Sequence, residues 1–196
     1  MDLMVDTVLE LATTESNRVA FCGSSRCVGT TMVAMSVARL ATRRYRRVLL
    51  IDADISKPDM TGLIGLPHGI TWMDAQAIDN PADTIIRSNE SGICVMPMAP
   101  LQSNVTLSPN RLDILGEVIA KVQDSFDLIL IDAGPCSQLI SELSHHSNLC
   151  DSAVLVHDMY RTEQNVFDQA KANMATFGVP KYAIVHNFTQ QNETRD

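Results

Sequence analysis

Residues 18–31 read RVAFCGSSRCVGTT, and this stretch decides the fold. Its first five residues are mostly apolar and predict a buried strand, residues 23–29 are mostly small and predict a loop, and a helix pattern begins at Thr30. A strand, a loop and a helix N-terminus in this order hold anions, because loop amides point inward and the helix dipole favours negative charge. The stretch therefore predicts a phosphate-binding loop. Its expected nucleotide-binding residues are Ser24, Ser25, Arg26, Cys27, Val28, Gly29, Thr30 and Thr31.

Two positions of this loop depart from the Walker A pattern G-x-x-x-x-G-K-[ST]. Gly29 takes the second glycine and Thr31 takes the magnesium-binding hydroxyl. Ser24, however, replaces the first glycine, and Thr30 replaces the lysine. The backbone can still hold phosphates, but a fixed positive charge beside the β- and γ-phosphates is lost. Either Arg26, inside the loop, supplies that charge instead, or its side chain faces water.

The composition is typical of a globular protein of one domain. The chain has 196 residues, 45% hydrophobic and 19% charged, so we predict a single domain over residues 1–196. The net charge of −8 argues against a general affinity for nucleic acid. Arginines at 43, 44, 46 and 47 form a basic cluster, which we interpret as a solvated helix end rather than a partner site.

The ends of the chain and the cysteines favour a cytosolic protein. The N-terminal segment carries acids and no leading basic region, so no signal peptide is predicted, and no apolar run reaches the roughly 18 residues of a membrane span. Cysteines at 22, 27, 94, 136 and 150 lack metal-ligand spacing and are interpreted as reduced thiols. Cys27 lies in the loop, where either helix-terminal amides activate its thiol or it stands in place of a glycine.

The rest of the chain alternates buried strands with amphipathic helices. Strands are predicted at 47–54, 92–98, 126–132, 152–157 and 182–187. Helices are predicted at 3–14, 111–123 and 161–177, and after the loop, where Val33, Val37 and Leu40 form one stripe. Between 56 and 91, prolines and glycines predict short helices and a mobile surface. This alternation predicts a doubly wound α/β fold with a mostly parallel sheet.

Acidic residues follow two of the predicted strands, at the edge where open parallel sheets bind ligands. Asp52 and Asp54 end the strand over 47–54, and they either hold magnesium and orient water or simply begin a loop. Asp132 ends the strand over 126–132, as a Walker B carboxylate does. The histidines, including His145 and His146, lack metal-ligand spacing, so we expect no histidine metal site.

Three segments together resemble the bacterial tyrosine autokinases of capsule and exopolysaccharide synthesis, a branch of the ParA/MinD-like P-loop ATPases. The segments are GSSRCVGTT, LLIDADISKPDMTGLIGLP and FDLILIDAGP, and the likeness covers about residues 16–188. The resemblance implies ATP and Mg²⁺ as cofactors. It also implies a cytoplasmic protein, recruited to the inner face of the membrane by a polysaccharide copolymerase or activator protein, and capable of self-association.

The resemblance also assigns roles to individual residues. It implies Thr31, Asp52 and Asp132 as magnesium ligands. It makes Asp52 and Asp54 the catalytic pair that orients an attacking tyrosine hydroxyl. Asn187, at the end of the last strand, would contact adenine.

Three departures from the family pattern bear on catalysis. Thr30 replaces the Walker lysine, Ser56 replaces an arginine of the D-x-D segment, and the C-terminus QQNETRD lacks a tyrosine cluster. These departures predict an ATP-binding protein with weakened or lost catalysis. The alternatives are a non-catalytic scaffold and a ParA/MinD-type positioning ATPase, although Ser25 replaces the signature lysine of the latter.

Overall fold

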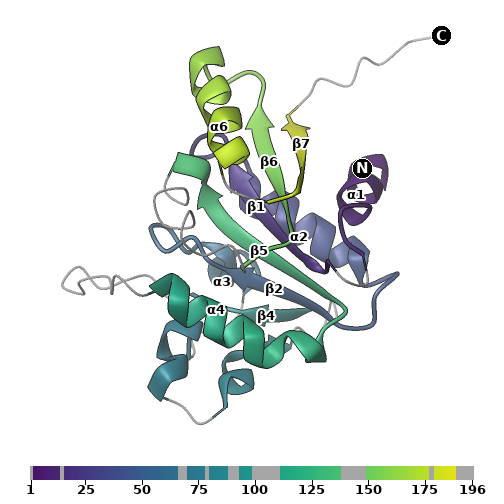
Figure 1. Cartoon of the computed structure of the whole chain (residues 1–196), viewed down its shortest axis with the longest axis vertical. Coiled ribbons are helices and arrows are strands. Elements are labelled where there is room, and N and C mark those ends of the chain that lie inside the picture. Colours follow the sequence, from purple (N-terminus) through teal and green to yellow (C-terminus); the bar gives the residue numbers. More distant parts are fainter. Residues whose placement is uncertain are drawn as a thin grey trace.

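One sheet organises the computed structural model, which describes residues 2–13, 16–65, 70–77, 80–87, 93–98, 111–137, 149–176 and 179–188 (Figure 1). Its strands are β1 (Arg18–Gly23), β2 (Val48–Asp52), β3 (Ile86–Arg87), β4 (Cys94–Met96), β5 (Leu128–Pro135), β6 (Ser152–Asp158) and β7 (Lys181–Asn187). Within the described residues they lie in the order β3-β4-β2-β5-β1-β6-β7. Only the edge pair of β3 and β4 is antiparallel.

The central strands are buried on both faces, as parallel strands covered by helices must be. Every residue of β2, β5 and β6 is buried. Their sequences VLLID, LILIDAGP and SAVLVHD are accordingly nearly continuous apolar runs rather than alternating ones. The predicted doubly wound α/β fold with a mostly parallel sheet is confirmed.

Helices cover both faces of the sheet and divide the core in two (Figure 1). The helices are α1 (Asp2–Leu9), α2 (Thr30–Ala41), α3 (Met60–Leu63), α4 (Arg111–Val122) and α6 (Gln164–Thr176). Short 3-10 helices are η1 (Trp72–Ala77), η2 (Pro81–Thr84) and η3 (Gln123–Ser125). One core half packs α1, α2 and Met60 against the sheet, and the other packs α4, α6 and Trp72. None of the described helices combines the length and the apolar character needed to cross a membrane.

The predicted elements are present, and the largest difference lies between β2 and β4. Short helices do form there, but the expectation of a surface segment is wrong at Trp72, which is fully buried. Its indole Nε1 donates a hydrogen bond to the carbonyl oxygen of Asp52, at 2.7 Å. Trp72 therefore anchors η1 on the end of β2. His145 and His146 lie outside the described residues.

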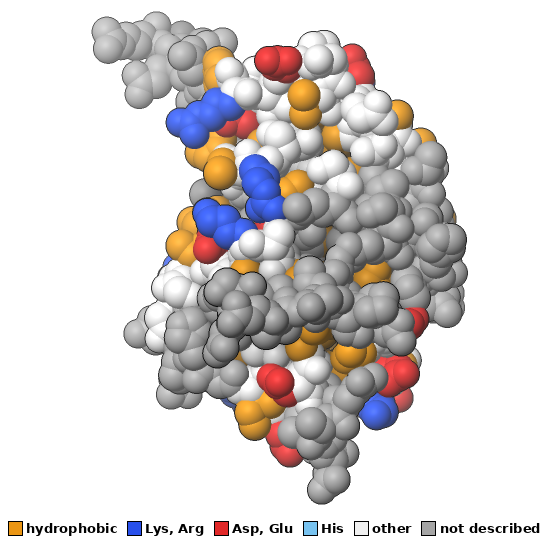
Figure 2. Space-filling model, turned by 90° about the vertical axis from the view of Figure 1, so that its left-hand side faces the viewer, with side chains coloured by type: hydrophobic (Ala, Val, Ile, Leu, Met, Phe, Trp, Pro, Cys, Tyr) orange, Lys and Arg blue, Asp and Glu red, His pale blue; other side chains and the backbone are white. Residues whose placement is uncertain are grey.

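The surface charge is mixed rather than uniformly basic. On the face shown in Figure 2, Lys and Arg side chains gather in one part, and acidic side chains lie close to some of them. Two arginines of the 43–47 cluster are in ion pairs: Arg44 with Asp6, and Arg47 with Asp127 at 2.7 Å. These pairs support the interpretation of the cluster as a solvated helix end.

The chain order places a binding edge at the end of β1. From β1 the chain passes through α2 to β2, which lies to one side of β1 within the sheet. Strands β6 and β7 lie to the other side of β1. Ligands of open α/β sheets bind at such a reversal, outside the carboxyl ends of the strands. The loop after β1 lies at this position.

Candidate functional site

The loop between β1 and α2 is held in a shape that depends on Gly29. Gly29 is the N-cap of α2, has a φ of 85°, and leaves the helix without a side-chain cap. The first amides of α2 therefore have no capping side chain, and they can donate to an anion. Asn187 Nδ2 donates to the carbonyl oxygen of Val28 at 2.9 Å. A Cβ at position 29 would lie 2.4 Å from that same nitrogen, and the φ of 85° strains any residue other than glycine there.

Cys27 has the backbone conformation of a glycine. Its φ is 61°, in the left-handed region that side chains disfavour. The interpretation of Cys27 as a residue in place of a glycine is therefore supported. Its side chain is exposed and lines the cavity described below.

Thr30, at the position of the Walker lysine, turns toward the end of β1. The Thr30 side chain is buried, and a Cβ on Gly23 would come within 2.6 Å of Thr30 Oγ1. The hydroxyl thus fills space beside the strand rather than reaching across the cavity. It carries no charge, so position 30 cannot neutralise phosphate oxygens.

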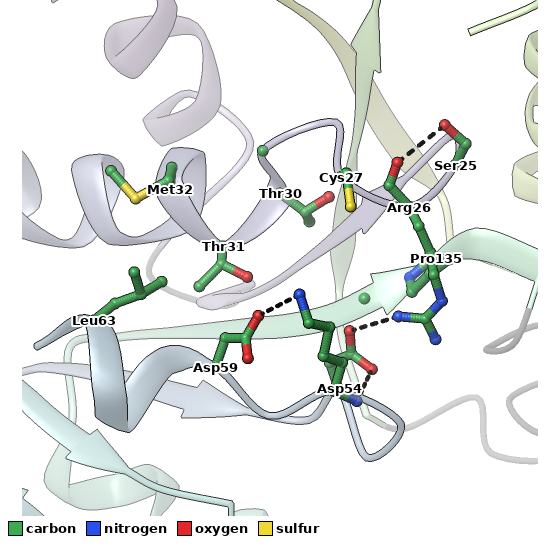
Figure 3. Close-up of a pocket in the computed structure, with 13 residues that line it drawn as sticks. Ser25, Arg26, Cys27, Thr30, Thr31, Met32, Asp54, Asp59, Leu63 and Pro135 are labelled. Atoms are coloured by element: carbon green, nitrogen blue, oxygen red, sulfur yellow. Dashed lines mark hydrogen bonds and ion pairs between the residues drawn. The ribbon is translucent and has the colours of Figure 1, made fainter. Parts of the chain in front are cut away.

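A cavity of about 210 Å³ opens in front of this loop. Figure 3 shows Thr30 and Thr31 on the loop side, with Asp54 and Asp59 facing them from the segment after β2. The lining residues are Ser25, Arg26, Cys27, Gly29, Thr30, Thr31, Met32, Asp54, Lys57, Asp59, Leu63, Gly134 and Pro135. The segments that follow β1 and β2, together with the last residues of β5, therefore form one site.

Three of the predicted nucleotide-binding residues do not line this cavity. Ser24 is buried, and its Oγ lies 3.3 Å from Nδ1 of His157 on β6. Val28 is buried in the core with the side chains of α2. Asn187 contacts the loop through the Val28 carbonyl. These three residues contact β6, the core and the loop backbone, whereas the other predicted loop residues line the cavity.

Arg26 lines the cavity, although its side chain is 42% exposed. Its guanidinium reaches from the loop toward Asp54, with 3.8 Å between Nη1 and Oδ2 (Figure 3). Its Nη2 also donates to the hydroxyl of Ser56. The Arg26 guanidinium therefore lies at the site, where it contacts Asp54 and Ser56.

Asp52 and Asp132 lie side by side beneath the cavity. The two residues are partners in the register of β2 and β5, and each is 1% exposed. Burial, and secondly the charge of Asp132, raise the pKa of Asp52 to about 8. Burial raises the pKa of Asp132 to about 6, although a hydrogen bond from Thr31 opposes the rise. Two adjacent buried carboxyls favour a proton or a cation between them.

The pair of Thr31 and Asp132 fits a magnesium ion. Thr31 lines the cavity, and its side chain lies close enough to the buried Asp132 carboxyl to oppose the rise in the pKa of Asp132. Protein sites for Mg²⁺ use one or two such oxygens, and phosphates and water complete the shell. The described part of the chain holds no cluster of three or more His, Cys, Asp or Glu able to bind a metal.

Asp54 is held by the turn that follows β2. Its Oδ1 accepts hydrogen bonds from the backbone amides of Ser56 and Lys57, both at 3.1 Å. Its own amide donates to Asp52 Oδ1 at 3.2 Å. The predicted catalytic pair is thus linked through the backbone, and only Asp54 lines the cavity.

Lys57 and Asp59 were not among the predicted site residues. Both line the cavity, with 3.0 Å between Lys57 Nζ and Asp59 Oδ2. The available signal was their place in DADISKPD, directly after a buried strand whose end faces the loop.

Comparison with known proteins finds similarity to tyrosine kinases and to ATPases. No family model matches the chain. It is 26% identical over 151 residues to tyrosine-protein kinase wzc of Salmonella typhi, which covers 68% of this chain and 20% of that protein. The crystal structure of the VpsO kinase domain superposes with a TM-score of 0.77 at 19% identity, covering 96% of this chain and 92% of that one. The cell division ATPase MinD of Pyrococcus furiosus superposes with a TM-score of 0.70 at 22% identity, covering 87% and 71%.

These similarities have different weight. The chain spans only about a fifth of the length of the Salmonella kinase, so that protein's whole activity does not carry over. The structural likenesses show the shared fold.

Proposed function

We propose that this chain, which belongs to the ParA/MinD-like P-loop ATPases that include the bacterial tyrosine autokinases, binds ATP with magnesium in the cavity after β1. The observation that carries the proposal is the cavity in front of the loop after β1, which is lined by Thr31 and by Gly29, the N-cap residue that leaves α2 without a side-chain cap. The loop amides hold the phosphates, and Thr31 and Asp132 hold magnesium, with Asp52 behind them. Bound magnesium neutralises phosphate charge.

Further roles follow from the family resemblance. Asp54 lines the cavity and would orient an attacking hydroxyl, and Asn187 would contact adenine. We infer a single domain over residues 1–196 that acts in the cytoplasm, at the inner face of the membrane, with a polysaccharide copolymerase or activator protein, and that self-associates.

We propose that catalysis is weak in this protein. Thr30 offers no cation, and Arg26 lies against Asp54, the group that would orient the acceptor. Loss of one preorganised stabilising group costs roughly a hundredfold or more in turnover. A non-catalytic scaffold is the second candidate, which the Arg26–Asp54 contact favours. A positioning ATPase of the ParA/MinD type is the third, supported by the MinD-like fold.

Nucleotide titration tests the binding proposal. A fluorescent ATP analogue is titrated with and without magnesium, into the unaltered protein and into Asp132→Ala and Asp52→Ala. We expect magnesium-dependent binding that both substitutions weaken. If millimolar nucleotide does not bind the unaltered protein, the scaffold is the correct function.

A second assay tests turnover. The protein is incubated with labelled ATP and examined for protein-bound phosphotyrosine, alone and as Thr30→Lys. Restoring the lysine should raise the rate if the remaining site is intact. An unchanged rate would show that catalysis is lost beyond position 30.

A further inference from the structure

Two cations line the cavity, and they come from opposite sides. Arg26 belongs to the loop after β1, and Lys57 belongs to the segment after β2. Neither occupies the Walker lysine position, which Thr30 fills with a buried, uncharged side chain. If phosphates bind here, these two lining side chains are the candidates to replace the missing charge.

Arg26 is already engaged within the protein. Its guanidinium contacts the Asp54 carboxylate and the Ser56 hydroxyl, both on the segment opposite the loop. These contacts tie the two sides of the cavity together. Moving the guanidinium to a phosphate would leave Asp54 without this cation.

Lys57 is held in place by its backbone rather than by its ammonium group. Its amide donates to Asp54 Oδ1 at 3.1 Å, and the buried Pro58 follows it directly. The Lys57 side chain is 60% exposed and forms an ion pair with Asp59, whose side chain is 49% exposed. The hydrogen bond that the Lys57 ammonium donates to Asp59, and secondly the charge of Asp59, raise the pKa of Lys57. The ammonium is therefore charged, and Lys57 lines the same cavity as the loop residues.

We propose that Lys57 is the phosphate-binding cation of this site and replaces the lysine missing from the loop. The inference rests on the proposed nucleotide binding and assigns the charge that such binding needs. In the structure the Lys57 ammonium is paired with the Asp59 carboxylate. When a nucleotide binds, a phosphate oxygen would replace that carboxylate as the partner of the ammonium. An exposed ion pair contributes little free energy, so exchanging Asp59 for a doubly charged phosphate is favourable. Arg26 is then a positioning residue that holds Asp54 and the loop.

The test compares four substitutions by calorimetric titration with ATP, AMP and inorganic tripolyphosphate. Lys57→Gln removes the charge, Lys57→Arg keeps it, and Asp59→Asn removes the competing carboxylate. Lys171→Gln is the matched control, since Lys171 on α6 forms a similar ion pair with Asp168 at 2.7 Å, away from the cavity. Thermal unfolding of each variant confirms the fold.

We expect Lys57→Gln to weaken ATP and tripolyphosphate binding by about tenfold or more, the usual effect of one charged hydrogen bond, and to leave AMP nearly unchanged. Lys57→Arg should keep most of the affinity, Asp59→Asn should increase it, and Lys171→Gln should have no effect. In the Lys57→Gln background, Thr30→Lys should restore binding to tripolyphosphate.

Two results overturn the inference in distinguishable ways. If the unaltered protein binds ATP and Lys57→Gln binds it equally well, Lys57 is not the cation, and the proposed function stands. If neither ATP nor tripolyphosphate binds the unaltered protein, the proposed function fails together with the inference. An equal loss of AMP and ATP affinity in Lys57→Gln also contradicts a role at the phosphates.

Discussion

Asp52 and Asp132 face each other as register partners on β2 and β5, and each has 1% of its surface exposed. Ionising two adjacent buried carboxyls costs free energy unless a cation lies beside them. Their burial raises the pKa of each, to about 8 for Asp52 and about 6 for Asp132. Ionisation of both carboxyls is therefore unfavourable in the folded protein, and a cation bound beside them would make it more favourable.

The first prediction concerns stability and pH in the absence of nucleotide. The pKa of Asp52 is 3.8 in the unfolded chain and about 8 in the folded protein. At a pH between these two values, Asp52 is ionised in the unfolded chain and protonated in the folded protein. The folded state then binds more protons, so the free energy of unfolding falls as pH rises, by at most about 1.4 kcal/mol per unit. Asp52→Asn removes this dependence. Its stability relative to the unaltered protein should rise between pH 5 and pH 8 in thermal unfolding.

A constant offset does not affect that test. The two carboxylate oxygens of Asp52 accept hydrogen bonds from the backbone amides of Asp54 and Met60, one each. Asparagine offers only one side-chain oxygen, so the substitution lowers stability at every pH. Asp83→Asn, on the exposed surface of η2, serves as the control. A difference between Asp52→Asn and the unaltered protein that is flat from pH 5 to pH 8 would contradict the prediction.

The second prediction concerns the shape of the loop. Gly29→Ala places a Cβ at a φ of 85° and within 2.4 Å of Asn187 Nδ2. We expect a loss of about 1–2 kcal/mol from the backbone alone, more from the clash, and loss of nucleotide binding. Gly62→Ala, in α3, is the control because no atom lies within 4 Å of its added Cβ. Equal unfolding temperatures for both variants would refute the role of Gly29.

The sequence allowed the sheet and the position of the site to be predicted, for a physical reason. Parallel strands covered on both faces must be apolar throughout, so 47–54, 126–132 and 152–157 were recognisable without knowledge of their neighbours. The loop of 23–29 was recognisable because its small residues interrupt such a strand before a helix. The phosphate site follows from that order alone.

The contacts across the cavity could not be predicted, because they depend on distances between segments. Spacing along the chain could not show that Arg26 reaches Asp54, or that Lys57 faces the loop. Trp72 lies among prolines and glycines, where the pattern indicated a surface, yet its indole bonds to the end of β2. In each case a side chain from an irregular segment is positioned by tertiary packing, which periodicity does not report.

The third prediction concerns Cys27. Its φ of 61° is tolerated by glycine, strained for cysteine and more strained for a β-branched residue. We expect Cys27→Gly to be neutral or to stabilise by up to about 1 kcal/mol, since relief of strain is partly offset by added freedom of the unfolded chain. Cys27→Val should destabilise, whereas Cys94→Val, within β4, should be tolerated. Urea unfolding measures the stabilities of these variants. If the Cys27→Val variant is as stable as the Cys27→Gly variant, the glycine-like role of position 27 is disproved.

The fourth prediction separates two roles for Asn187. The family resemblance gives it a contact with adenine, while the structure shows its amide donating to the Val28 carbonyl within the loop. Removing the amide leaves that carbonyl without this donor and loosens the turn before Gly29, at a cost of about 1 kcal/mol. Asn187→Ala should therefore weaken binding of ATP and of inorganic tripolyphosphate, which has no base. If tripolyphosphate binds Asn187→Ala as well as it binds the unaltered protein, the residue acts on the base alone and the loop keeps its shape without it.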